Sequence, residues 1–461
     1  MSGGSLSIAL SGLDAAQTGL DTVSENISNA NTPGYLKETA SLSNQQTPGD
    51  PIGDGVTVTG ILQSSNSFNR QLELSANGAQ SYANQMQSLL TSAQNSFNEP
   101  SSSGISEQMN TMYNDFSSVA DNPTQLAPRT QLVAAAQNVV TAINQAATNL
   151  TATYNQAASA ASTLVGTINS QLQEVASINT QLASTSLTPG ASNTLVDQQN
   201  QVIDQLASEL GVTSIPGNAG QTTLLIGGVA LVQGGSAQQL QFSAASQSVP
   251  DAPNTAQVTL VSSDTQVPVS GGTLGATLTA LNNNLPSYGT YLNSLATTLA
   301  NNVNGQLASG TSQTASGTGS QSGVPLFVST SAGTAINAAT LGVNSAIVGN
   351  PMLIAASGLT YDPGDGSNAQ AVANQQTSTT GAIAAWASSV AQVGLDVQNA
   401  TANATNATNA YNQAYSAEQS VSGVSVNSQL VNLVNYQQQY QAAAKVISTV
   451  ATTLQSLIQD V

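Results

Sequence analysis

Few residues of this chain could do chemistry, and their types and spacing form no catalytic arrangement. The 461 residues include no histidine and no cysteine, which removes the commonest general base, the usual metal ligands and every thiol nucleophile. Asp362 and Asp365 lie in the glycine-rich stretch YDPGDGSNA. That composition is typical of calcium loops, but the ligand spacing and the terminal glutamate of such a loop are absent. We interpret the stretch as a turn in which a Ser or Asn caps the following helix.

Two other groups of residues invite a functional interpretation. Paired glycines follow a strand-like run in LIGGVALVQGG, but neither a lysine nor a helix start comes after them, which argues against a phosphate-binding loop. Asp197, Asp204 and Glu209 lie at helical spacing, and without a histidine or an aromatic neighbour we interpret them as a solvated face. The sequence therefore predicts no catalytic residue, no metal site and no cofactor, and the chain is not expected to be an enzyme.

The charge composition excludes further classes of function. Charged residues make up 6% of the chain, against about 25% in ordinary soluble proteins. Four basic residues stand against 22 acidic ones, for a formal net charge of −18, so binding to nucleic acid or to an anionic membrane surface is not expected. The sequence predicts no membrane insertion and no cleaved secretory signal peptide. We expect any export to use another route.

The elements that position these residues are marked by apolar residues at alternating spacings of three and four. We call such a run a seam, because these positions form the helix face that a coiled coil buries. The N-terminal seam consists of Leu6, Ala9, Leu13, Ala16, Leu20, Val23, Ile27 and Ala30. The sequence therefore predicts a long helix that packs along another helix.

The C-terminal segment repeats this pattern, with one polar position at Gln437. Its seam consists of Leu430, Leu433, Tyr440, Ala444, Ile447, Ala451, Leu454, Ile458 and Val461. The two ends could be ordinary surface helices of one globular domain, or they could pair with each other or with other copies of the chain. We favour pairing, because terminal segments usually fray unless something ties them down.

A third seam lies inside the chain, between Val133 and Leu182, where apolar residues recur every seven positions and Gln171 interrupts them. About fifty residues of helix would span about 75 Å. Pro128 is placed to start this helix and Pro189 to close it. The following stretch, NTLVDQQNQVIDQLASELGV, predicts a shorter antiparallel partner.

The pattern changes to short strands between Gly211 and Gly272. The run TTLLIGGVALVQ predicts a hairpin that turns at Gly227 and Gly228, and AQVTLVSS and TQVPVSGG predict further strands. Helical composition returns from Leu274 to Leu307, and long helices are predicted again before the C-terminus.

This order of elements predicts a mainly α fold with an inserted β domain. We expect an elongated antiparallel helical rod whose N- and C-terminal coiled-coil-forming helices pair at one pole. The expected domains are a terminal coiled-coil core of residues 1–60 with 426–461, a helical rod of 61–210 with 273–425, and a small β domain of 211–272. Because a seam without its partner gains little from folding, we expect the terminal helices to become ordered on assembly.

A rigid corner follows the N-terminal seam, at Asn31, Thr32, Pro33, Gly34 and Tyr35. Pro33 fixes its own φ and disfavours helix at the preceding residue. Gly34 supplies a positive φ if the turn is of type II. Tyr35 is then placed to anchor the extended segment that leaves the corner. Such a corner suits a subunit of a tubular assembly. There the terminal helix packs against neighbouring subunits, and the segment that follows it must cross those subunits at a fixed angle.

These terminal stretches resemble a known family. SGLDAAQTGLDTVSENISNANTPGY closely resembles the N-terminal signature of bacterial flagellar rod, hook and hook-associated proteins, and LVNLVNYQQQYQAAAKVISTVATTLQSLI resembles the signature at their other end. Internal stretches are similar to the first hook-associated proteins, the members that join hook to filament. These stretches are GISEQMNTMYNDFSSVADNPTQLAPRTQLV, LVDQQNQVIDQLASELGV, GGTLGATL, and NPMLIAASG with GDGSNA.

The resemblance implies a structural protein of the extracellular flagellum, located at the hook–filament junction and exported through the flagellum's own secretion channel. It implies a ring of about eleven copies, with the hook protein on the cell side and the second hook–filament junction protein on the distal side. It also implies an export chaperone that binds the C-terminal helix. The residues assigned to assembly are the seam residues Leu6, Leu13, Leu20, Ile27, Leu430, Leu433, Tyr440, Ile447, Leu454 and Ile458, with the corner residues Asn31 to Tyr35.

Three positions depart from the family pattern. Gln199 stands where the family usually has an arginine, Gln306 stands where a histidine is frequent, and Lys37 is the one basic residue just after the corner. We expect these departures to change the electrostatics of the surface and of the lateral contacts between subunits, and not the class of protein to which the chain belongs.

Two alternatives stay open. The chain could be a different axial protein, a hook or distal rod subunit, but those are largely β between their terminal helices and lack a long internal helical rod. It could instead be a secreted adhesin or surface-layer protein, as its Ser, Thr, Asn, Gln and Ala content and its acidity suggest. Such a protein would need neither paired terminal seams nor the corner, so deleting both termini should leave its function intact.

Overall fold

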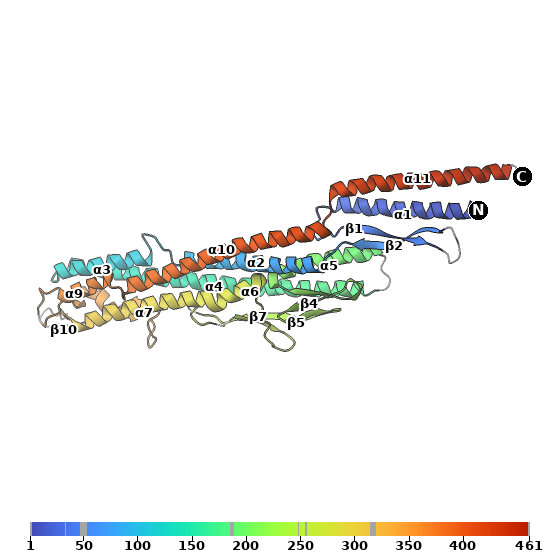
Figure 1. Ribbon diagram of the computed structural model, residues 1–461. Helices are drawn as coiled ribbons and strands as arrows, with labels where there is room; N and C mark the ends of the chain where they lie inside the picture. Colours follow the sequence, from blue (N-terminus) through green and yellow to red (C-terminus); the bar gives the residue numbers. More distant parts are fainter. Residues whose placement is uncertain are drawn as a thin grey trace. The chain divides into compact units, whose positions relative to one another are not determined.

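The computed structural model describes residues 2–32, 34–46, 53–184, 189–247, 249–253, 256–313, 320–360 and 362–459. The chain is mainly helical, with short strands between the helices (Figure 1). It divides into two compact units. The terminal unit comprises residues 1–80, 167–239 and 407–461, and the second unit comprises residues 81–166 and 240–406.

Most of the chain is in helices, and most of these begin within a few residues of a proline or a glycine. The helices of at least 8 residues are α1 (Ser2–Ser28), α2 (Ser67–Asn95), α3 (Ile105–Asp121), α4 (Leu126–Leu182), α5 (Pro189–Leu210), α6 (Gly272–Thr279), α7 (Leu285–Ser309), α10 (Ala382–Ser422) and α11 (Val426–Gln459). Two short helices, α8 (Ser345–Gly349) and α9 (Ser367–Ala373), precede α10. A π-helical turn, Ala280–Asn284, joins α6 to α7.

The strands form small antiparallel ladders. In chain order they are β1 (Glu38–Gln45), β2 (Gly55–Gln63), β3 (Thr213–Pro216), β4 (Thr222–Ile226), β5 (Val229–Gln233), β6 (Ser236–Ala237), β7 (Leu240–Ala244), β8 (Ala256–Leu260), β9 (Thr311–Gln313), β10 (Ser320–Ser322), β11 (Phe327–Ser329) and β12 (Leu341–Val343). Strands β3 to β6 make one four-stranded sheet in sequence order, and the other described strands pair two by two.

The structure confirms the predicted fold class, with long helices on both sides of the inserted strands. The internal seam lies on α4, a single helix of 57 residues that starts two residues before Pro128. The predicted hairpin is β4–β5, with Gly227 at φ 52° and Gly228 at φ 85° in its turn. Glycine suits this turn because positive φ is costly for other residues.

The strand predicted over TQVPVSGG is wrong. Among the described residues this stretch makes an isolated bridge from Gln266 to Thr259, its Val267 N–H donates to Val258, and its Thr265 oxygen accepts from the Leu260 N–H. The physical reason is the next residue, Pro268, which has no N–H to continue the ladder.

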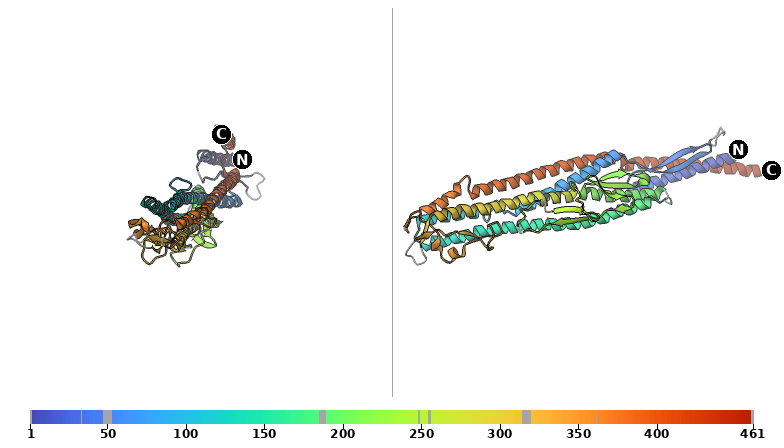
Figure 2. Two further views of the ribbon diagram at one scale, coloured as in Figure 1. Left: turned by 90° about the vertical axis from the view of Figure 1, so that its left-hand side faces the viewer. Right: turned by 90° about the horizontal axis from the view of Figure 1, so that it is seen from below.

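In the terminal unit, α1 pairs with α11 and the β1–β2 hairpin packs along α1 (Figure 1). The start of α1 and the end of α11 therefore lie at the same end of this helix pair, and Figure 2 shows these two helices side by side. The pairing of the terminal helices is as the two seams predict. The hairpin has a β-bulge between Ser41 and Leu42.

A buried amide network holds the four-stranded sheet against α4 and α5. Asn179, which is 0% exposed, donates to the carbonyl oxygens of Thr222 (2.8 Å) and Gly234 (2.9 Å). Its own oxygen accepts from the Thr222 N–H and from Gln199. Gln199 is 1% exposed, so the expectation that this departure changes surface electrostatics is wrong. Its amide completes an interior network, where each unpaired polar group would be costly.

The second unit is built around buried aromatic rings. Phe97 packs edge-on against Trp386, with ring centroids 5.4 Å apart, and against Tyr288 at 6.0 Å. The Trp386 indole N–H donates to Glu99 (3.0 Å), which also accepts from the backbone N–H of Ser106. Glu99 thus satisfies both a buried tryptophan and a free N–H in the first turn of α3.

Candidate assembly interface

Helix α1 buries its small residues and leaves its large ones partly accessible. Ala9, Ala16 and Val23 are 6%, 1% and 3% exposed. The larger seam residues Leu6, Leu13, Leu20 and Ile27 are half-buried. Because α11 and the hairpin cover only part of the apolar face of α1, these four side chains keep apolar surface available for further contacts.

A second row of mostly small residues lets α1 and α11 approach closely. This row runs through Ala15, Gly19, Thr22 and Asn26. A methyl group placed on Gly19 would lie 2.5 Å from the ring of Tyr436 on α11, so glycine is needed there for the two helices to pack as they do. This row was not predicted from the sequence, although its spacing of three and four is visible there.

Helix α11 is covered along one side and accessible along another. Leu433, Tyr440, Ile447 and Leu454 are half-buried, and the side chain of Ile458 lies outside the described residues. Leu430, assigned to the seam, is 47% exposed. Four further apolar residues of α11 are also exposed, Val426 at 42%, Val431 at 62%, Val434 at 50% and Val446 at 47%.

Asn26 connects the helix pair to the corner. Its side chain is 0% exposed and donates to the backbone oxygen of Glu38 (2.8 Å) and to Gln429 of α11 (3.5 Å). Its oxygen accepts from the Glu38 N–H (2.8 Å) and from the Tyr35 hydroxyl (3.1 Å). One amide thus holds α1, the corner, β1 and α11 together. The sequence did not reveal this role, because it depends on partners in the corner, in β1 and in α11 that only the tertiary structure brings to Asn26.

The corner residues form a tight turn. The Tyr35 N–H donates to the Thr32 oxygen (3.3 Å), and Gly34 has φ 79°, as a type II turn requires at its third position. Pro33 lies outside the described residues, and Asn31 and Thr32 are exposed. Burial, followed by the nearby carboxylates of Glu38, Glu25 and Asp197, raises the pKa of Tyr35, so its hydroxyl stays a hydrogen-bond donor.

Two carboxyl groups fasten this corner to α5. Asn193 donates to Glu38 (2.8 Å) and to the Ile61 carbonyl (3.1 Å), and Gln63 donates to Asp197 (2.9 Å). Burial raises the pKa of Asp197 to about 7, against hydrogen bonds from Leu36 and Gln63 that lower it.

The interpretation of Asp197, Asp204 and Glu209 as a solvated face is therefore wrong. Besides the tie from Asp197 to the hairpin, Asp204 pairs with Arg70 at 2.6 Å, and Glu209 accepts a hydrogen bond from Gln171 (3.3 Å). Helical spacing alone could not reveal the hairpin and helices that cover these carboxyl groups.

Lys37 joins the corner to the end of α10. Its backbone N–H donates to the Ser422 oxygen (2.8 Å) and its ammonium group to the Val421 oxygen (3.2 Å). A cation at the carboxyl end of a helix satisfies free carbonyl groups and the helix dipole. Lys37, the one basic residue just after the corner, thus makes its contacts within the terminal unit.

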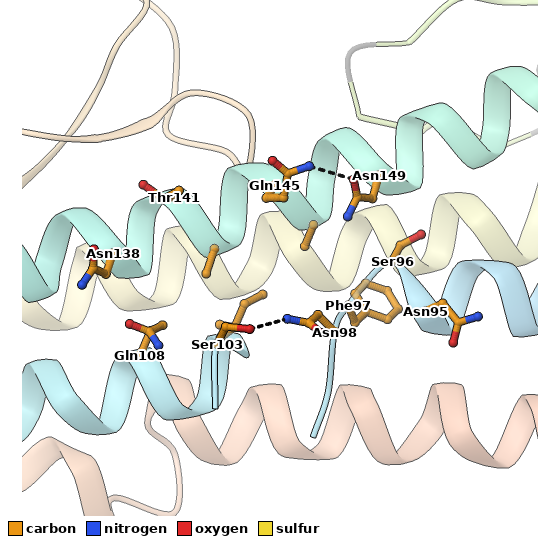
Figure 3. Close-up of a pocket in the computed structure, with 13 residues that line it drawn as sticks. Asn95, Ser96, Phe97, Asn98, Ser103, Gln108, Asn138, Thr141, Gln145 and Asn149 are labelled. Atoms are coloured by element: carbon orange, nitrogen blue, oxygen red, sulfur yellow. Dashed lines mark hydrogen bonds between the residues drawn. The ribbon is translucent and has the colours of Figure 1, made fainter. Parts of the chain in front are cut away.

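A cavity in the second unit has no charged lining residue. It measures about 480 Å³ and is lined mainly by amides and hydroxyls from the end of α2, the start of α3 and the middle of α4 (Figure 3). Asn98 donates to Ser103 (3.0 Å), and Gln145 donates to Asn149 (2.8 Å). Without an acid, a base or a nucleophile activated by one, this lining cannot perform acid–base catalysis.

The stretch around Asp365 is a turn, as predicted, but the capping residue is different. Asp365 itself accepts from the backbone N–H groups of Ser367 (3.0 Å) and Gly358 (2.7 Å) and from the hydroxyls of Ser357 and Ser367. Burial alone would raise the pKa of this carboxyl, but the hydrogen bonds outweigh it and lower the pKa to about 2. A carboxylate outcompetes Ser or Asn because it accepts several charge-assisted hydrogen bonds at once.

The described residues also bear on metal binding and on membrane insertion. No group of three His, Cys, Asp or Glu side chains there is arranged to hold a metal ion. None of the described helices has the length and apolarity needed to cross a membrane.

Comparison with known proteins places both chain ends in the axial proteins of the flagellum. Residues 6–35 match the flagella basal body rod protein family, and residues 416–460 match the C-terminal family of flagellar basal body rod FlgEFG proteins. Residues 90–327 match the family described as flagellar hook-associated protein FlgK helical domain. This last match spans more than half of the sequence, and the chain belongs to that family, whose members are structural flagellar proteins rather than enzymes.

Individual relatives agree with this assignment. The chain is 28% identical over 263 residues to flagellar hook-associated protein 1 of Salmonella typhimurium, covering 56% of this chain and 46% of that protein. It is 27% identical over 266 residues to the Escherichia coli K12 protein of the same name, covering 56% and 47%. The match to the Bacillus subtilis protein is 26% over 218 residues, or 45% and 43%. The matched region thus spans about half the length of these relatives.

A solved structure has the same fold. The flagellar hook junction protein FlgK from Burkholderia pseudomallei superposes with a TM-score of 0.62 at 17% identity, covering 77% of this chain and all of that one.

Proposed function

We propose that this chain is a structural subunit of the bacterial flagellum that assembles with copies of itself into a ring joining hook to filament. The observation that carries the proposal is the apolar surface that the paired terminal helices leave open, on the half-buried residues of α1 and on the exposed residues of α11. Family membership supports the same role, because the relatives it matches are named as hook-associated and hook junction proteins.

The proposed location is outside the cell, at the hook–filament junction. The proposed partners are the hook protein on the cell side, the second hook–filament junction protein on the distal side, and an export chaperone that binds the C-terminal helix before assembly. The assembly residues are Leu6, Leu13, Leu20 and Ile27 on α1 and Leu430, Leu433, Tyr440, Ile447, Leu454 and Ile458 on α11. In this proposal the corner from Asn31 to Tyr35 sets the angle at which the hairpin leaves the helix pair.

The proposal is tested by complementation. The chain is expressed in a flagellated strain that lacks its own hook-associated protein 1, and its position is determined by immunogold electron microscopy. We expect label at the boundary between hook and filament and restored filament attachment. Label along the whole hook or within the rod would favour the alternative of a hook or distal rod subunit. Label on the cell body, retained after both termini are deleted, would favour an adhesin or surface-layer protein.

A further inference from the structure

A cavity behind the corner contains an unbalanced cluster of charges. It measures about 440 Å³ and is enclosed by the corner, α2, α5 and α10, all within the terminal unit. Arg70 pairs there with Glu73 at 2.7 Å and with Asp204 at 2.6 Å. Glu418 of α10 lines the same cavity. Three carboxyl groups therefore face one guanidinium group.

Glu418 is the member of this cluster that has no partner of its own. It is 5% exposed, and its buried Oε2 atom accepts no hydrogen bond within the described residues. Arg70 is committed to Glu73, Asp204 and the Asn200 carbonyl oxygen. A buried carboxylate without a partner is costly, so Glu418 lacks a cation to pair with inside this cavity.

The lining favours an organic cation over a metal ion. The described carboxyl groups are not arranged to hold a metal. Two aromatic side chains, Tyr411 and Tyr415, line the cavity with ring centroids 5.9 Å apart. A lysine or arginine side chain can place its charge near Glu418 while its stem or head contacts these rings.

Among the described residues, one basic side chain has no partner and could fill this role. Its four basic residues are Lys37, Arg70, Arg129 and Lys445. Lys37 donates to Val421, Arg70 is paired as above, and Arg129 donates to the carbonyl oxygens of Pro123 (2.7 Å) and Ile354 (2.6 Å). Lys445 lies exposed on α11 beside the exposed Val446, and its ammonium group has no hydrogen bond or ion pair with any described residue.

Lys445 cannot reach the cavity of its own copy. Val424, which lines the cavity, comes just before α11 starts at Val426. Lys445 lies nineteen residues further along this continuous helix, which places it about 28 Å from the helix start. A lysine side chain cannot span that distance, so the positive charge must come from a different molecule.

We propose that Lys445 of one copy enters the cavity of a neighbouring copy and pairs with Glu418. This inference rests on the proposed function, because it requires copies of the chain to assemble. The pair would set the register between neighbours: every copy of this strongly acidic chain carries one free lysine and one acidic cavity that fits it.

Cysteine crosslinking tests the contact directly, because the chain has no cysteine of its own. Lys445→Cys in one sample is mixed with Gln419→Cys in another, the latter at an exposed position that lines the cavity. The two variants differ in tag length, so a disulfide between them is recognised by mass. The matched control is Gln439→Cys, an exposed position on a different face of α11. We expect on the order of tenfold more mixed dimer with Lys445→Cys than with the control.

Association measured by sedimentation velocity gives the second readout. Lys445→Gln and Glu418→Gln should each weaken association on the order of tenfold, Lys445→Arg should retain it, and the double variant should lose no more than either single one. Glu418→Gln should also raise the melting temperature of the isolated chain, because it removes an unpaired buried charge. A merely structural role for Glu418 predicts the opposite shift.

The outcomes separate this inference from the proposed function. Copies that associate without preferential crosslinking at Lys445, or with unchanged affinity in Lys445→Gln, overturn the inference and leave the assembly role standing. A chain that stays monomeric at every concentration, and fails to complement, overturns both.

Discussion

Helices α4 and α11 carry the same heptad pattern of apolar residues, but they bury it to different extents. In α4, Ile143, Leu150 and Ile168 are each 0% exposed. In α11, α1 covers only part of the seam: Leu433 and Ile447 are half-buried, and Leu430 is 47% exposed. One helix uses its apolar face within the chain, and the other leaves much of that face open.

The difference shows which structural properties can be predicted from a seam and which cannot. Apolar periodicity establishes that a helix has a face to bury, but the number of elements that cover it is a tertiary property. A face that stays open in the isolated chain is the part of the molecule available to other copies. The same substitution placed in each seam should therefore have different consequences.

Ile143→Asp should have the largest effect. It places a charge among fully buried side chains of the second unit, where no described basic group faces it. We expect a loss of more than about 4 kcal/mol in the free energy of unfolding, measured by chemical denaturation followed by circular dichroism. A loss below about 1 kcal/mol would show that α4 is not enclosed as its 0% exposure indicates.

Ile447→Asp should spare the fold and abolish assembly. Ile447 is half-buried on α11, so its carboxylate can turn toward water, but each interface would lose about 1.5–3 kcal/mol of apolar burial. We expect a denaturation midpoint close to that of the unmodified chain, together with loss of association in sedimentation velocity and loss of filament attachment. Equal loss of stability in Ile447→Asp and Ile143→Asp would contradict the distinction between the two seams.

Amide hydrogen exchange should report the same contrast without any mutation. In the monomer, we expect amides of residues 1–35 and 426–461 to exchange on the order of a hundredfold faster than those of 133–182, because the apolar face of the terminal pair is only partly covered whereas that of α4 is enclosed. On assembly the terminal amides should become protected. Equal protection of both regions in the monomer would mean that α1 and α11 already satisfy each other, and function would then be sought on the β strands.

Gly19→Ala should have a smaller effect, confined to the terminal pair. Its methyl group would meet the Tyr436 ring, and the resulting overpacking should weaken the pairing of α1 with α11 by about 1–2 kcal/mol. The matched control is Gly12→Ala, where nothing lies within 4 Å of the added methyl and helix propensity predicts a gain of about 0.5–1 kcal/mol. Exchange rates of α1 amides should therefore move in opposite directions in the two variants. The close approach of the helices is refuted if both variants slow exchange.

The parts of the fold that could be predicted are those that depend on local sequence patterns. The heptad spacing predicted α1, α4 and α11, and the glycine pair predicted the turn between β4 and β5. The roles of Asn26, Asn179 and Glu418 could not be predicted, because each depends on partners that lie far away in the chain. The acidic residues of α5 were misjudged for the same reason. Their spacing is that of a solvated face, and only the tertiary structure shows that the hairpin and Arg70 cover them.

Asp197→Asn should have the smallest effect on stability. It tests whether the stability of the terminal unit depends on pH through the carboxyl group at its corner. Burial, with lesser contributions from Glu38 and Glu25, raises the pKa of this carboxyl from 3.8 to about 7 in the folded state. Between these two values the folded chain binds a proton that the unfolded chain has released, so this group's contribution to stability falls as the pH rises from about 4 to about 7 and is constant above that.

Asparagine keeps an oxygen for the hydrogen bond from Gln63 but cannot ionise. The melting temperature of Asp197→Asn should therefore fall less than that of the unmodified chain between about pH 4 and pH 7. The control is Asp14→Asn on the exposed side of α1, which removes one carboxyl group without touching the corner. Parallel profiles for Asp197→Asn and the unmodified chain would mean that water reaches this carboxyl and that the corner is not sealed against α5. The angle set by the corner would then depend on the turn at Gly34 and on Asn26 alone.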